Sequence, residues 1–134
     1  MNISFGHIGI NVRDLETSKK FYDSLFNFLG AENSHIGKNY AGWFFKDFSL
    51  WLHQVGKPHL ADPYDEKHLG MQHIAFRAKQ KSEVDELYHS YLLPKKIPIL
   101  YNGPAEYPQY TKGYYAVFFL DPDGIKLELM WTPE

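Results

Sequence analysis

The sequence predicts an α+β fold made of two βαβββ modules within one domain of 134 residues. The same order of predicted strands and helix occurs in residues 1–56 and again in residues 71–134, and the chain ends in a strongly apolar hairpin. The motif HIGI at residues 7–10 also matches HIAF at residues 73–76, at an offset of 66. Internal duplication is the simplest explanation, and it would place the histidines of the two motifs in equivalent registers.

The first module begins with a strand and a helix. Residues 3–12 alternate between polar and apolar side chains after position 7, which is the period of a half-buried strand. Asp14 is a helix N-cap residue, apolar residues then recur at spacings of three and four over residues 15–29, and Gly30 stands where a left-handed C-cap is expected. Three short strands follow, at residues 31–36, 39–46 and 49–55.

A linker separates this module from its repeat. Residues 57–70 are polar, contain two prolines and show no periodicity. Beyond them, Ser82 and Asp85 form a predicted capping box for a helix that ends at Pro94. The strands expected in the second module are residues 71–78, residues 97–101, the run that starts at Tyr114, and residues 125–129, with a loop over residues 102–113.

Composition excludes several classes of protein. Lys and Arg number 14 against 16 Asp and Glu, without a basic block, so nucleic acid is not an expected partner. The absence of cysteine excludes a disulfide framework, a thiolate metal site and a cysteine nucleophile, so any metal must be held by His, Asp or Glu. No signal-peptide pattern or long apolar run is present, which predicts a cytoplasmic protein without a membrane partner.

Glu128 is the unusual residue of the final hairpin. It is flanked by two leucines in an apolar strand, where an ionised carboxylate costs several kcal/mol of desolvation unless it is paired or coordinated. A cationic partner is therefore expected opposite Glu128, and the alternative is an ordinary glutamate that faces solvent. Together with His7 and His73, Glu128 makes up the two-histidine, one-carboxylate set that binds Fe(II), Mn(II), Ni(II) or Zn(II).

These three residues, the Phe-Tyr pair at residues 21–22 and the segment FLDPDGIKLEL at residues 119–129 resemble the vicinal oxygen chelate superfamily. That superfamily includes glyoxalase I, bleomycin-resistance proteins, extradiol dioxygenases and fosfomycin-modifying enzymes. The resemblance implies paired βαβββ modules that form a curled mixed sheet around a metal-binding cavity. It also implies that His7, His73 and Glu128 bind a divalent metal ion, which a small substrate chelates through vicinal oxygens, and that the protein is a homodimer.

The sequence departs from this pattern at two positions. Glyoxalase I carries a fourth metal ligand at the position symmetric with Glu128, and aligning residues 48–53 with residues 125–130 places Trp51 there. An indole has only an N–H donor and cannot bind a cation through it. Extradiol dioxygenases usually have a tyrosine ten residues before the glutamate, and here that residue is Phe118.

Other side chains are candidates for catalysis and substrate binding. His53 lies two residues after Trp51 on the same face, where it is a fourth ligand or a general base, or a strand-end residue that meets solvent. Arg77 either holds an anionic part of the substrate or makes a salt bridge. The loop over residues 102–113 is a lid or a surface crossover. An aromatic pocket for a small planar or apolar substrate is expected from Trp51, Tyr114 and Phe118.

The sequence thus favours a metal-dependent enzyme that carries out a glyoxalase-like lyase or isomerase step. The metal ion would be Zn, Ni, Mn or Fe, bound by His7, His73 and Glu128, and the catalytic residues would be Glu128 and His53. Two alternatives stay open: a metal-free ligand-sequestering protein of the bleomycin-resistance type, and a one-domain extradiol dioxygenase.

Overall fold

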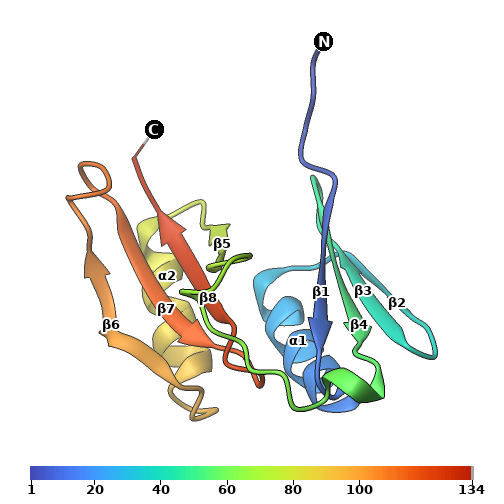
Figure 1. Cartoon of the computed structure of the whole chain (residues 1–134). Coiled ribbons are helices and arrows are strands. Elements are labelled where there is room, and N and C mark those ends of the chain that lie inside the picture. Colours follow the sequence, from blue (N-terminus) through green and yellow to red (C-terminus); the bar gives the residue numbers. More distant parts are fainter. Residues whose placement is uncertain (134) are drawn as a thin grey trace. The chain divides into compact units, whose positions relative to one another are not determined.

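The computed structural model describes residues 1–133 and divides into two compact units. Unit 1 is Met1–Pro63, and unit 2 begins at Tyr64. Each unit contains a four-stranded mixed sheet and the element order βαβββ, so the predicted α+β class and the repeated module are confirmed (Figure 1). Each sheet is hydrogen-bonded within its own unit. Within residues 1–133, no helix is both long enough and apolar enough to span a membrane.

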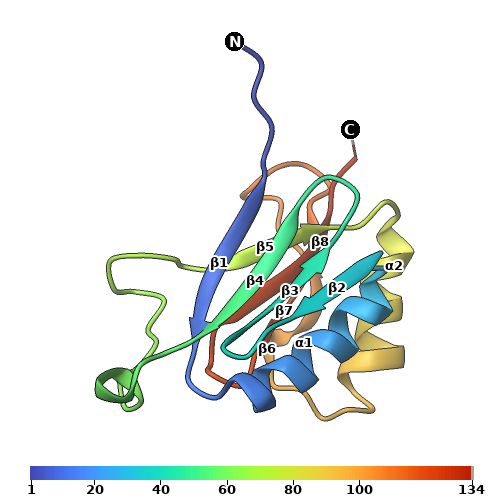
Figure 2. The ribbon, with the colours of Figure 1, turned by 90° about the vertical axis from the view of Figure 1, so that its right-hand side faces the viewer.

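Unit 1 has the strand order β1-β4-β3-β2, with β1 parallel to β4 and the other pairs antiparallel. The helix α1 packs on β3 and β4 and covers one face of this sheet (Figure 2). The chain then passes through a short 3-10 turn inside the predicted linker, η1 (Lys57–His59). The elements of unit 1 are β1 (His7–Val12), α1 (Leu15–Leu29), β2 (Asn33–Ile36), β3 (Tyr40–Phe44) and β4 (Ser49–Gln54).

The helix α1 begins and ends where the sequence predicts. The Asp14 carboxylate accepts the backbone N–H of Glu16 at 3.1 Å, which satisfies a donor that the first helical turn leaves unpaired. Gly30 ends the helix with φ of 89°, a conformation that glycine adopts at little cost. Between these caps, Phe26 is fully buried against Trp43 of β3 at a centroid distance of 5.4 Å, and this contact anchors the helix to the sheet.

Alternation along the strands gives the unit 1 sheet two different faces. Leu50, Leu52 and Trp43 are buried on the face that α1 covers. The opposite face carries the intervening residues, and we call it the open face of unit 1. Its side chains come from β1, β3 and β4: His7, Asn11, Tyr40, Phe44, Trp51 and His53.

Unit 2 has the strand order β5-β8-β7-β6, with β5 parallel to β8 and the other pairs antiparallel. The helix α2 packs on β7 and β8 and continues into a π-helical turn, η2. The elements of unit 2 are β5 (Ile74–Arg77), α2 (Lys81–Leu87), η2 (Tyr88–Leu92), β6 (Ile99–Glu106), β7 (Tyr115–Leu120) and β8 (Lys126–Trp131).

Several predicted strands are shorter than expected, and β1 and β5 lose the most residues. β1 begins at His7 rather than at residue 3, because its pairing with β4 starts where His7 lies opposite Ser49 and residues 1–6 are exposed. β5 is limited to Ile74–Arg77 within the predicted residues 71–78, because its ladder with β8 starts only at Ile74.

The capping box of α2 was predicted at the wrong residues. The helix begins at Lys81, and the box is formed by Gln80 and Glu83 rather than by Ser82 and Asp85. The Glu83 carboxylate accepts the backbone N–H of Lys79 at 2.7 Å and that of Gln80 at 2.9 Å. Gln80 and Glu83 therefore pair the backbone N–H groups at the start of the helix, and Asp85 is available for another contact.

β6 extends beyond the predicted residues 97–101 and takes up the first part of the predicted loop. Tyr101, Asn102 and Gly103 have left-handed φ values of 56°, 66° and 100°, and the register shifts between Leu100 and Ala105. This bulge absorbs the extra residues, so pairing with β7 resumes and continues to Glu106.

Tyr115 of β7 is the residue that uses Asp85. The Tyr115 hydroxyl donates to Oδ1 of Asp85 at 2.6 Å and ties the sheet of unit 2 to α2. Burial, together with this hydrogen bond, raises the pKa of Tyr115 from its ordinary 10.0 to about 12.

Replacing Tyr115→Phe is expected to lower the free energy of unfolding by about 1 kcal/mol at neutral pH. Because the pKa of Tyr115 is raised by folding, its contribution is fully present below pH 10.0 and is lost as the pH rises past about 12. Urea unfolding across this range measures the difference, and Asp85→Asn, which keeps an acceptor oxygen, should cost less. Equal stabilities of wild type and Tyr115→Phe at pH 7 would show that the contact contributes nothing.

Candidate functional site

The candidate site is centred on the carboxylate of Glu128 in β8. Glu128 is only 1% exposed, so the solvent-facing alternative is wrong. Phe118 of β7 lies directly opposite it, and alternation along β8 places Lys126 and Met130 on the same face. We call this the site face of unit 2. The Glu128 carboxylate is therefore surrounded by protein atoms, and its charge must be compensated there.

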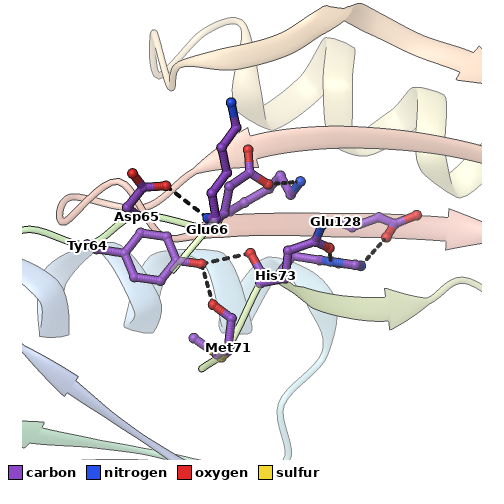
Figure 3. A network of polar contacts seen from close by, with 9 residues as sticks. Tyr64, Asp65, Glu66, Met71, His73 and Glu128 are labelled. Carbon is purple, nitrogen blue, oxygen red and sulfur yellow. Dashed lines mark hydrogen bonds and ion pairs between the residues drawn. The ribbon is translucent and has the colours of Figure 1, made fainter. Parts of the chain in front are cut away.

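Two side chains supply that compensation, one at each carboxylate oxygen. The Tyr114 hydroxyl donates to Oε1 of Glu128 at 2.6 Å. Nε2 of His73 lies 3.1 Å from Oε2, and a dashed line marks this contact in Figure 3. His73 immediately precedes β5, which pairs in parallel with β8 so that Ala75 lies opposite Glu128. The side chain that lies opposite Glu128, where the sequence predicted a cationic partner, is therefore the imidazole of His73.

The other ring nitrogen of His73 constrains what can lie between the two side chains. Nδ1 is 2.7 Å from Oε1 of Gln72, an oxygen that can only accept, so a hydrogen bond here places the proton on Nδ1. A neutral imidazole would then direct the lone pair of Nε2 at the Glu128 carboxylate, which is unfavourable without a positive charge between them. Two donor atoms about 2.1 Å from one metal ion, at right angles, lie about 3 Å apart. The donor pair therefore fits a divalent cation as well as a proton.

Tyr114 is held as a hydrogen-bond donor. Burial, followed by the hydrogen bond to Glu128, raises the pKa of Tyr114 above its ordinary 10.0, so the phenol keeps its proton at neutral pH. Arg77 opposes this shift electrostatically. Arg77 is exposed and lies opposite Met130, so it is on the site face.

Aromatic side chains cover the site face. The ring of Phe118 is 5.4 Å from that of Tyr107 and 6.3 Å from the imidazole of His73. Tyr110 stacks on Tyr107 at 5.6 Å. The part of the predicted lid that follows β6 therefore packs on Phe118, the residue opposite Glu128.

Trp51 holds the position in unit 1 that Glu128 holds in unit 2. Gly9 lies opposite Trp51 just as Ala75 lies opposite Glu128, and in each unit a histidine stands two residues earlier. The Trp51 ring lies flat on Gly42, where an added Cβ would come within 2.4 Å of the ring. Unit 1 therefore presents an aromatic surface at the place where unit 2 presents a carboxylate.

His7 and His53 lie on the open face of unit 1, and both are exposed. The His53 imidazole is 3.8 Å from the position that a Cβ on Gly9 would take. His73 and Glu128 belong to unit 2, so the predicted meeting of His7 with them, and the catalytic role of His53, stay predictions. Among residues 1–133, no three His, Cys, Asp or Glu side chains gather to hold a metal ion.

Sequence reasoning missed part of the site. Tyr114 was predicted to line a pocket, but the hydrogen bond of its hydroxyl to Glu128 was not predicted. Gln72, which fixes the His73 ring, precedes the predicted ligand and carries no motif. Lys126 lies on the site face and pairs with Glu66. The argument used for Glu128 could have identified Lys126, because alternation places Lys126 and Glu128 on the same face of an apolar strand.

Comparison with known proteins agrees with the fold and the repeated strands. The family model of the Glyoxalase/Bleomycin resistance protein/Dioxygenase superfamily matches residues 4–129. The chain belongs to this superfamily. That description covers lyases, oxygenases and ligand-binding proteins, so membership alone does not select a reaction.

Three similar proteins illustrate the range. The uncharacterised protein YqjT of Bacillus subtilis (strain 168) is 33% identical over 124 residues, which are 92% of this chain and 95% of that protein. A solved structure from Bacillus halodurans, a proposed glyoxalase, has 31% identity and a TM-score of 0.82 over 94% of this chain and 93% of the other. Lactoylglutathione lyase from Agrobacterium tumefaciens shares the fold, with 22% identity and a TM-score of 0.66 over 97% and 92% of the two chains.

Replacing Tyr114→Phe leaves Oε1 of Glu128 buried without its donor, and we expect this to lower the free energy of unfolding by about 1.5–3 kcal/mol. Tyr110→Phe is the matched control, because Tyr110 is 62% exposed. A double-mutant cycle of Tyr114→Phe with Glu128→Gln, followed by urea unfolding, isolates the interaction, and the coupling energy should exceed about 0.5 kcal/mol. Additive effects would mean that the hydrogen bond does not hold Glu128.

Proposed function

We propose that this protein is a divalent-metal-dependent enzyme that carries out a glyoxalase-like lyase or isomerase step. Its substrate would be a small molecule that chelates the metal through vicinal oxygens. The observation that supports this most strongly is the contact of 3.1 Å between Nε2 of His73 and Oε2 of Glu128, where each side chain is held from behind by a second partner. Metal ligands in proteins are typically oriented by such outer hydrogen bonds.

His73 and Glu128 would hold the cation, and His7 is the third ligand that we propose, since it occupies the equivalent register of the repeat. Zinc, nickel, manganese and iron are all compatible with two imidazoles and a carboxylate. When bound, the cation would polarise the substrate oxygens and stabilise negative charge that develops on them.

The other residues have separate tasks in this proposal. Tyr114 engages Oε1 of Glu128 and leaves Oε2 as the oxygen that faces His73. Phe118 and Tyr107 exclude water from the carboxylate and, with Trp51 and Tyr114, present aromatic surface to the substrate. Proton transfer would fall to Glu128 or His53.

A second candidate is a metal-free ligand-sequestering protein of the bleomycin-resistance type. The observation that favours it is the Trp51 ring, which meets Phe44 at 5.5 Å and Tyr40 at 6.2 Å on the open face of unit 1. Such an aromatic surface suits a flat bound molecule, and it offers no fourth side chain to a metal ion. A one-domain extradiol dioxygenase is less well supported, because Phe118 offers no hydroxyl opposite Glu128. In either candidate we propose a homodimer as the assembly.

Elemental mass spectrometry on protein purified without an affinity tag tests the proposal. We expect nearly one transition metal ion per chain in the wild type. In His73→Ala and in Glu128→Ala, the metal content should fall by about tenfold or more. His7→Ala tests the third ligand in the same way. The matched control is His68→Ala, since His68 is an exposed histidine of unit 2 that pairs with Asp65 instead.

The identity of the metal then directs the search for a reaction, with iron pointing to an oxygenase and nickel, zinc or manganese to a lyase or isomerase. If the wild type takes up no metal after incubation with each ion, the enzyme proposal is wrong and the ligand-sequestering protein becomes the account to pursue.

A further inference from the structure

A buried lysine lies beside the candidate metal ligands on the site face of unit 2. Lys126 is 7% exposed and pairs with the carboxylate of Glu66. It stands two residues before Glu128 in β8, so the two side chains lie on one face, roughly 7 Å apart along the strand. Nothing in the function proposed above uses this lysine.

The counterion of Lys126 comes from a segment outside the sheet. Residues 64–73 contain neither a helix nor a strand, and the side chain of Glu66 is 31% exposed. The Tyr64 hydroxyl lies within hydrogen-bond distance of the carbonyl oxygens of Met71, at 2.9 Å, and Gln72, at 2.7 Å (Figure 3). These contacts close the base of the segment independently of Glu66. Glu66 can therefore leave Lys126 without breaking a strand pair.

Two aromatic rings form walls around the lysine ammonium. Nζ of Lys126 is 5.9 Å from the ring centre of Tyr101 and 5.9 Å from that of Phe118, within cation–π range. The backbone of Tyr101 is left-handed, with φ of 56°, which is rare for a bulky residue. Strained residues of this kind persist where the surrounding structure fixes them, often at ligand sites.

Lys126 keeps its charge in this environment. The carboxylate of Glu66 pairs with its Nζ, and the rings of Tyr101 and Phe118 lie within cation–π range, so all of these contacts favour the charged form of the ammonium. An ammonium held among aromatic rings, away from water, requires an anion at all times. If Glu66 moves away, another anion must replace it.

We propose that Lys126 is the anchor for a carboxylate group of the substrate, and that Glu66 occupies this position until the substrate displaces it. The substrate class is then a small carboxylic acid with a flat or apolar body, because the walls of the position are Tyr101 and Phe118. This inference rests on the proposed function for the cation site next to it, and the acid group would lie roughly 7 Å from the oxygens that face Glu128.

Arg77 is the competing anchor. It is exposed on the same face, on the other side of Glu128 from Lys126. An exposed guanidinium is already hydrated, so an anion gains less there than at a buried ammonium. The two cations can be separated by substitution.

Benzoate and its neutral isostere benzamide are suitable probes, titrated calorimetrically into the full chain, both as purified and after treatment with EDTA. Glu66→Gln removes the competing carboxylate, so it should bind benzoate at least tenfold more tightly than the wild type. Lys126→Met should abolish benzoate binding. Arg77→Ala should keep a benzoate affinity within about twofold of the wild-type value. The affinity for benzamide should be no higher in any of these variants than in the wild type. The double variant Glu66→Gln with Lys126→Met removes both charges and is the folded control if Glu66→Gln alone is unstable.

Three outcomes would overturn the inference. The first is that Glu66→Gln binds benzoate no more tightly than the wild type. The second is that Lys126→Met or the double variant still binds benzoate. The third is that Arg77→Ala, with Lys126 intact, loses benzoate binding. Because the expected differences hold with and without EDTA, failure of the proposed metal site would leave this result intact. Failure of the anchor would likewise leave the metal content of the wild type unchanged.

Discussion

The cost of burying the Glu128 carboxylate is the constraint on which the rest of unit 2 depends. An unpaired carboxylate that is 1% exposed would cost several kcal/mol. Tyr114 and His73 offset this cost, and they come from the start of β7 and from the residue before β5. One carboxylate therefore holds together the ends of two elements, and it directs one oxygen toward an imidazole in an arrangement that suits a cation.

The repeated modules use one backbone register for two different surfaces. Position for position, Trp51 in unit 1 corresponds to Glu128 in unit 2, and Gly9 corresponds to Ala75. The tryptophan is accommodated because Gly42 of the neighbouring strand has no side chain beneath the ring. Duplication thus provides the frame, and single substitutions on it decide whether a face offers a metal ligand or an aromatic platform.

Features encoded by neighbouring residues could be predicted from the sequence, and features that depend on distant contacts could not. The caps of α1 at Asp14 and Gly30 and the final hairpin follow from local pattern, and the need for a partner at Glu128 follows from the energetics of a buried charge. The role of Asp85 depends on Tyr115, 30 residues away, and that of Lys126 depends on Glu66, 60 residues away. No short-range signal encodes such pairs.

The central claim is that His73 and Glu128 bind one cation between them. Anomalous diffraction from crystals grown with manganese, collected on both sides of the manganese absorption edge, tests it most directly. We expect a single strong peak within about 2.3 Å of both Nε2 of His73 and Oε2 of Glu128. An unbroken contact between these two atoms without a peak, or a peak bound elsewhere on the chain, would contradict the claim.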